Sequence, residues 1–210
     1  VDQRNHGKSP HSDEMSFELM AEDLAELIAD LGIEKAHVLG HSMGGKTAMK
    51  FADIHPDKLE KLIIVDIAPK KYQPGHTAYF DAFNTINFSL FETRKEADTA
   101  LAEIESNIGI RQFLLKNLDK ADVGYQLKFN LKPIEAFYPK MIDAMGLQWI
   151  ISVPTLFIYG EKSGYITEND MLTIEETFTE SRFVMIPDAG HWVHAEQPNA
   201  FYNVVLDFLA

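Results

Sequence analysis

The sequence predicts an α/β protein in which a doubly wound, mostly parallel sheet is interrupted by a helical insertion. Short apolar runs of strand length alternate with segments whose apolar residues recur at helical spacing. This alternation breaks over residues 69–149 and resumes after Pro154. The turn that follows the apolar run at 36–39 reads Gly-His-Ser-Met-Gly-Gly, at residues 40–45, and a helical pattern follows it.

Composition limits the classes of protein that this chain can belong to. Of its 210 residues 46% are hydrophobic, which fits one large domain or a domain with an insertion. The formal net charge of −13 disfavours nucleic acid as a partner, because acidic surfaces repel phosphate. The chain has no cysteine, which excludes disulfides and a cysteine nucleophile. No apolar run has the length of a membrane span, and we expect a cytoplasmic protein.

Before the insertion we expect a helix, a strand, a second helix and a second strand. Ser16 can cap the first helix and Gly32 follows its last turn. The four elements are expected at residues 17–31, 36–39, 46 to about 54, and 62–65. Because the strands are apolar throughout, they fit a parallel sheet that is covered on both faces.

The segment of residues 69–149 is too long for a loop and is rich in aromatic and aliphatic side chains. Its pattern is mostly helical, with a short polar run at 118–124, and it predicts a cap whose aromatic residues mostly form its own core. The predicted domains are therefore a core of residues 1–68 and 150–210 and a cap of residues 69–149. Beyond the cap we expect strands at 155–159 and 182–186 and helices at 168–178 and 199–209.

The turn at residues 40–45 suits a serine nucleophile. A strand that turns sharply into a helix strains the residue at the turn and lifts its side chain clear of the sheet. Ser42 has this position, at a helix N-terminus that favours negative charge. The backbone N–H of Met43 is then expected to donate to the oxyanion. Glycine-rich turns before helices are common, so the pentapeptide alone leaves a purely structural role open.

A serine hydroxyl needs a general base, and the base needs a carboxylate that orients it. His191 is the candidate base, because it lies in a loop directly after the last predicted strand. Loops at the carboxyl ends of parallel strands meet at one edge of the sheet, where Ser42 is also expected. His194 lies three residues beyond His191, but no third ligand is evident and we expect no metal.

Four motifs follow one another along the whole chain. They are Arg-Asn-His-Gly-Lys-Ser-Pro at residues 4–10, Gly-His-Ser-Met-Gly-Gly-Lys at 40–46, Val-Asp-Ile-Ala-Pro at 65–69 and Gly-His-Trp-Val-His-Ala-Glu at 190–196. Together they resemble the α/β-hydrolase superfamily, specifically the YbfF-type bacterial esterases. The resemblance implies a capped α/β-hydrolase fold, serine-dependent ester hydrolysis and no cofactor. It also implies strands that this sequence lacks, with the loop of the second oxyanion donor, so we expect the natural protein to be longer.

The acid that orients the base has two candidates. In most α/β-hydrolases it lies in a Gly-x-x-Asp turn, but here the turn reads Gly-Glu-Lys-Ser, with Ser163 in place of the aspartate. Asp66 ends the strand after the nucleophile helix, and the resemblance to YbfF-type esterases assigns the role to it. Glu161 is the alternative, because its longer side chain can reach toward the histidine.

The predicted activity is that of a serine carboxylesterase that acts on small to medium acyl esters, or on thioesters such as acyl-CoA, through an acyl-enzyme. Asn5, His41 and Trp192 are candidate substrate contacts. Hydrolysis of a carbon–carbon bond by the same residues is an alternative reaction. A non-catalytic protein that binds a small molecule is the alternative of another class. The presence of a nucleophile, a base and an acid favours an enzyme.

Overall fold

The computed structural model describes all 210 residues, which divide into two compact units. The first, here called the sheet unit, contains Ser16–Tyr72 and Asp143–Ala210. The second, the helical unit, contains Val1–Met15 and Gln73–Ile142. The first fifteen residues thus group with the predicted cap, whereas the sequence prediction assigned them to the core.

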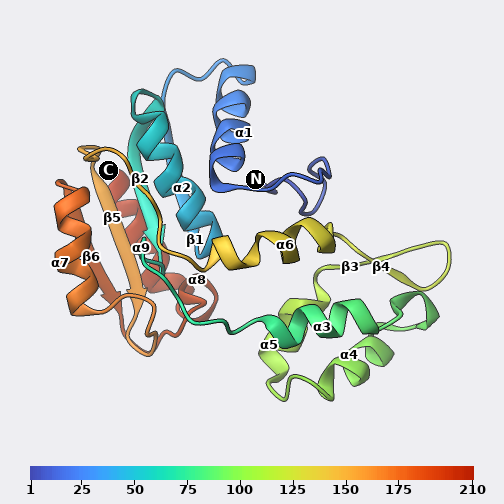
Figure 1. Cartoon of the computed structure of the whole chain (residues 1–210). Coiled ribbons are helices and arrows are strands. Elements are labelled where there is room, and N and C mark those ends of the chain that lie inside the picture. The colour runs from blue at the N-terminus through green and yellow to red at the C-terminus, as the bar shows by residue number, and fades with distance from the viewer. The chain divides into compact units, whose positions relative to one another are not determined.

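The sheet unit is built on four parallel strands, whose spatial order is β1-β2-β5-β6 (Figure 1). The strands are β1 (Ala36–His41), β2 (Leu59–Val65), β5 (Thr155–Gly160) and β6 (Ser181–Ile186). β2 and β5 are neighbours, with Leu62 opposite Thr155, although most of the helical unit lies between them in the sequence. This parallel sheet of apolar strands confirms the predicted fold class.

Helices cover both faces of the sheet (Figure 1). The core of one face includes α1 (Phe17–Asp30), α2 (Met43–Ile54) and α7 (Glu168–Thr177), and the core of the other includes α8 (Val193–Glu196) and α9 (Pro198–Leu209). Successive strand residues point to opposite faces. Leu62 and Ile64 of β2 accordingly join the first core, and Ile63 and Val65 join the second. None of the helices has the length and apolar character that a membrane span requires.

A polar face of α2 is buried in the sheet unit. The Lys46 ammonium donates to the carbonyl oxygens of Lys70 and Asp143, at 3.2 Å and 2.6 Å. Burial lowers the pKa of Lys46 to about 8. One turn later, Lys50 forms an ion pair of 3.0 Å with the buried Asp53. The two Lys46 contacts attach the first turn of α2, and with it the turn before the helix, to the backbone at Lys70 and Asp143.

The helical unit contains four helices and a short hairpin. The helices are α3 (Thr77–Thr85), α4 (Arg94–Ala102), α5 (Ile108–Leu115) and α6 (Leu131–Met141). The hairpin pairs β3 (Leu118–Lys120) with β4 (Tyr125–Leu127), where the sequence prediction had only a polar run within a helical segment. Gly124 closes this hairpin at φ 64°, and its Cα packs against the backbone of Ser89, where a Cβ has no room. The unit has its own core, with Phe83 and Phe88 among its buried residues.

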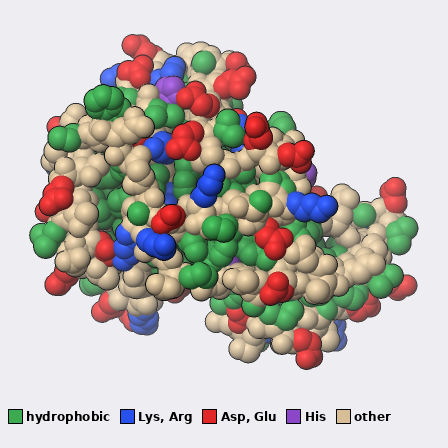
Figure 2. Space-filling model, viewed as in Figure 1, with side chains coloured by type: hydrophobic (Ala, Val, Ile, Leu, Met, Phe, Trp, Pro, Cys, Tyr) green, Lys and Arg blue, Asp and Glu red, His purple; other side chains and the backbone are tan.

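Acidic side chains are spread over the face that Figure 2 shows, with lysines and arginines scattered between them. This distribution agrees with the net charge of −13. Basic side chains do not gather on that face into the kind of patch that binds a phosphate backbone.

Candidate active site

Ser42 lies at the turn between β1 and α2 and has a strained backbone, with φ 53° and ψ −118°. Residues other than glycine, asparagine and aspartate rarely adopt a positive φ, and such strain is concentrated at functional sites. The neighbouring glycines make the turn possible, because a Cβ on Gly40 would collide with the backbone of Gly44. The Ser42 N–H donates to the carbonyl of Val65, at 3.1 Å, which ties the turn to the end of β2.

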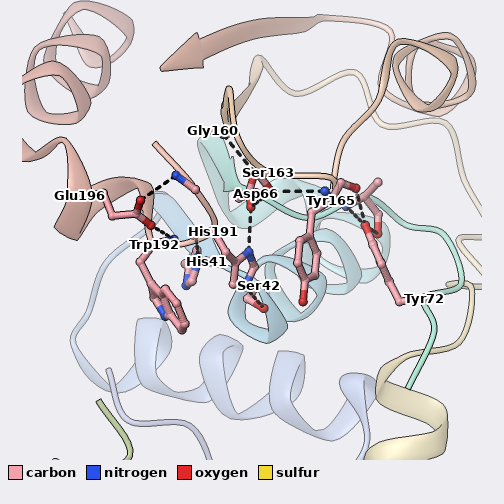
Figure 3. A network of polar contacts seen from close by, with 12 residues as sticks. His41, Ser42, Asp66, Tyr72, Gly160, Ser163, Tyr165, His191, Trp192 and Glu196 are labelled. Atoms are coloured by element: carbon pink, nitrogen blue, oxygen red, sulfur yellow. Dashed lines mark hydrogen bonds and ion pairs between the residues drawn. The ribbon is translucent and has the colours of Figure 1, made fainter. Parts of the chain in front are cut away.

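The three predicted triad residues meet at the carboxyl ends of the strands (Figure 3). Ser42 follows β1, Asp66 follows β2 and His191 follows β6. His191 Nε2 lies 3.1 Å from Ser42 Oγ, and His191 Nδ1 lies 2.7 Å from Asp66 Oδ2. With the Nδ1 proton held by the carboxylate, Nε2 is free to accept the proton of the serine hydroxyl.

Asp66 is fully buried and also has a positive φ, of 52°. A buried carboxylate is stable only when donors surround it. Asp66 Oδ1 accepts the N–H of Gly160 at 3.1 Å, and Oδ2 accepts both His191 and the hydroxyl of Ser163, the latter at 2.5 Å. These three donors satisfy the carboxylate and fix its direction.

Ser163 is a residue for which the sequence analysis gave no role. It stands at the last position of the Gly-Glu-Lys-Ser turn after β5, and its hydroxyl donates to Asp66, which follows β2. The signal available in the sequence was a serine, a small hydrogen-bond donor, in place of the aspartate expected in the Gly-x-x-Asp turn. Glu161, the alternative acid, instead accepts the N–H of Asp188 through Oε2, at 2.8 Å. The carboxylate that contacts His191 is therefore that of Asp66.

Two tyrosines hold one side of the base. The Tyr165 ring stacks on the His191 imidazole, with 4.0 Å between the ring centroids and 18° between the planes. The Tyr72 hydroxyl donates to the carbonyl of Tyr165, at 2.9 Å. Burial raises the pKa of Tyr72, so its hydroxyl remains a neutral donor. Neither tyrosine was predicted as part of the site, because a single aromatic residue in a loop carries no positional signal.

His41, a predicted substrate contact, instead contacts the backbone of the base. Its Nε2 lies 2.8 Å from the carbonyl oxygen of His191, and the two rings are 4.7 Å apart. Burial and the neighbouring His191 lower the pKa of His41 to about 4, so this ring is neutral at pH 7. A neutral ring with its proton on Nε2 donates to that carbonyl.

We expect acid to destabilise the protein in part through His41. In the unfolded chain this ring binds a proton near pH 6.5, but in the folded protein only near pH 4. Between these values the unfolded state binds more protons, so the free energy of unfolding falls as the pH falls. The His41→Gln variant should lose less stability over this range. Urea denaturation of both proteins at several pH values measures the difference. If the free energy of unfolding falls with pH equally in the two proteins between pH 6.5 and about pH 4, the expectation is contradicted.

The remaining predicted site residues lie in three different settings. Met43 is the first residue of α2, where backbone N–H groups have no partner within the helix. The Trp192 ring is 5.9 Å from the His191 ring, and its backbone N–H donates to Glu196. Asn5 belongs to the helical unit, where it is fully buried and its Oδ1 accepts the N–H of Ser12, at 2.8 Å. That contact is structural within its own loop.

Known proteins resemble this chain along most or all of its length. A family model described as alpha/beta hydrolase fold matches residues 1–198. This chain belongs to the α/β-hydrolase family. Among its relatives is the sn-1-specific diacylglycerol lipase ABHD11 of Mus musculus, which is 38% identical over all of this chain and 70% of its own length. The Escherichia coli esterase YbfF is 35% identical over all of this chain and 81% of its own length.

A solved structure titled "Marine microorganism esterase" superposes on this α/β-hydrolase with a TM-score of 0.95. It is 45% identical and the match covers 99% of this chain and 83% of that one. The resemblance to YbfF-type esterases is thereby confirmed. Relatives named esterases and lipases also support the prediction of a carboxylic ester hydrolase.

Proposed function

We propose that this α/β-hydrolase cleaves carboxylic esters with Ser42 as nucleophile, His191 as general base and Asp66 as the acid that orients it. The observation that carries the proposal is the unbroken series of contacts from Asp66 through His191 to Ser42, at 2.7 Å and 3.1 Å. The strained backbone of Ser42 supports it, because such strain persists where function requires it.

The first half-reaction forms an acyl-enzyme. Ser42 Oγ attacks the acyl carbon while its proton passes to His191 Nε2, and Asp66 stabilises the imidazolium that results. The backbone N–H of Met43 donates to the oxyanion of the tetrahedral intermediate. When that intermediate collapses, the bond to the alcohol breaks and His191 returns the proton to the leaving oxygen.

The second half-reaction uses the same groups with water in place of the alcohol. The water oxygen attacks the acyl carbon while His191 takes a proton from the water. When this second intermediate collapses, the bond to Ser42 Oγ breaks, His191 returns the proton to Ser42, and the carboxylic acid leaves. We propose small to medium acyl esters as substrates and acyl-CoA-type thioesters as a second class. The name of the relative from Mus musculus adds diacylglycerols to the esters worth testing. A cap formed by residues 69–149 remains a prediction of the sequence.

A fluorophosphonate probe tests the proposal, because it reacts only with an activated serine. We expect the probe to label this protein, peptide mapping to place the adduct on Ser42, and the Ser42→Ala variant to stay unlabelled. Excess chromogenic ester should slow the labelling. A folded wild-type protein that takes up no label at Ser42 contradicts catalysis and favours the small-molecule-binding alternative.

A further inference from the structure

Glu196 makes two contacts on either side of the base that the proposed mechanism does not use (Figure 3). Its Oε2 accepts the backbone N–H of Gly190 at 2.8 Å, and its Oε1 accepts that of Trp192 at 3.1 Å. His191 is the single residue between these two. One carboxylate thus binds the backbone N–H groups of the two residues that flank the base.

The carboxylate is attached to a fixed part of the sheet unit. Glu196 is the last residue of α8, and the first residue of that helix, Val193, is fully buried in the same core as Ile186 and Ala189. The helix is therefore held by packing, and it places Glu196 beside the loop that carries His191. Gly190 approaches Glu196 closely, since a Cβ on this glycine would lie 3.1 Å from Oε1.

The other side of the loop is held by backbone contacts. Lys162 N–H donates to the carbonyl of Ala189 at 2.8 Å, and Gly160 packs against the backbone of Ala189 and Gly190, where a Cβ has no room. His41 holds the carbonyl of His191 itself. On the side that faces α8, the loop is held by the Glu196 side chain, through its two hydrogen bonds to Gly190 and Trp192.

We propose that Glu196 is a positioning residue for the general base: its two oxygens bind the N–H groups that flank His191 and so hold the imidazole between Asp66 and Ser42. The inference rests on the proposed function. Both contacts are exposed to solvent, so water can satisfy the two N–H groups when the carboxylate is removed. Loss of Glu196 should therefore affect the placement of the base more than the stability of the fold.

The test measures kcat per competent site, which titration with the fluorophosphonate probe counts. For Glu196→Ala we expect kcat per titrated site to fall roughly 10- to 100-fold, because a small misplacement of a reacting group carries a cost of that order. KM should stay within about threefold of the wild-type value, since the substrate is not the group displaced. Glu196→Gln, which keeps one acceptor oxygen, should lie between the alanine variant and the wild type.

A matched control exists in the helical unit. Glu96 is another exposed carboxylate that accepts two backbone N–H groups, those of Glu92 and Thr93. We expect Glu96→Ala to leave kcat per titrated site unchanged. Thermal unfolding identifies the variants that fold. If Glu196→Ala does not fold, the kcat per titrated site of Glu196→Gln is compared with the wild-type value instead.

Two results overturn the inference. In one, Glu196→Ala lowers only the number of titrated sites, which indicates a role in folding alone. In the other, the glutamine variant is as impaired as the alanine variant, which indicates that the charge matters and the paired acceptors do not. A wild-type protein that the probe cannot titrate instead refutes the proposed function, and the inference with it.

Discussion

Replacing Ser42 with alanine is expected to lower kcat for a chromogenic short-chain ester by roughly 10⁶-fold, the order found for the nucleophile of a serine triad. The change removes the hydroxyl that lies 3.1 Å from His191 Nε2, and under the proposed mechanism it leaves no group to form the acyl-enzyme. Initial rates measured with enough enzyme to detect the residual reaction give the ratio.

The structure also predicts how this loss combines with others. His191→Ala should be impaired to a similar degree, and the double variant should be no worse than either single one, because the two residues act as a unit. Alanine keeps the Cβ of Ser42 and so keeps its strained backbone, at φ 53°, and we expect the unfolding temperature to change little. Turnover that survives the Ser42 change at the wild-type rate places catalysis elsewhere in the protein.

Replacing Asp66 with asparagine is expected to lower kcat by about 10⁴-fold, as loss of the orienting acid does in other triads. The reason lies in the donors around Asp66. Its Oδ1 accepts the N–H of Gly160 and its Oδ2 accepts Ser163 and His191. An asparagine that keeps its oxygen toward Gly160 turns its NH₂ group toward His191. The imidazole then has to accept at Nδ1 and carry its proton on Nε2.

An imidazole in that tautomer cannot take the proton of Ser42, so the chemical step fails while the geometry stays intact. The kcat/KM values of Asp66→Asn and of Glu161→Gln, measured side by side, test the assignment. Because Glu161 binds the N–H of Asp188, its variant should lose less than about tenfold. A crippled Glu161→Gln beside an active Asp66→Asn reverses the assignment of the acid.

Much of the fold follows from local signals in the sequence. Apolar runs at the spacing of buried strands gave the parallel sheet, and Ser16 caps α1 as expected, with its hydroxyl accepting the N–H of Leu19. The turn at Ser42 is equally local, since Gly40 permits the close approach that the strained serine needs. Such features depend on residues next to one another in the chain, so a single sequence contains them.

Which carboxylate contacts His191, and what surrounds it, was decided by contacts between distant parts of the chain. Asp66 reaches Gly160 and Ser163 because β2 and β5 are neighbours in the sheet, and most of the helical unit separates them in the sequence. The sequence therefore left Asp66 and Glu161 both open. Strand order and side-chain direction, which no local pattern encodes, decide which carboxylate contacts His191.

The same reason explains what the sequence missed. Stacking of Tyr165 on His191 depends on how the loops after β5 and β6 meet. The Glu196 contacts, which span only four and six residues, depend instead on how the loop after β6 folds back against α8. In the hairpin of β3 and β4, Gly124 likewise packs against the backbone of Ser89, which lies far from it in the sequence. Periodicity, capping and turn strain thus predicted the sheet, the turn at Ser42 and the candidate base from the sequence alone. The tertiary structure decided which groups surround the base, because hydrogen bonds between loops depend on the packing of strands far apart in the chain.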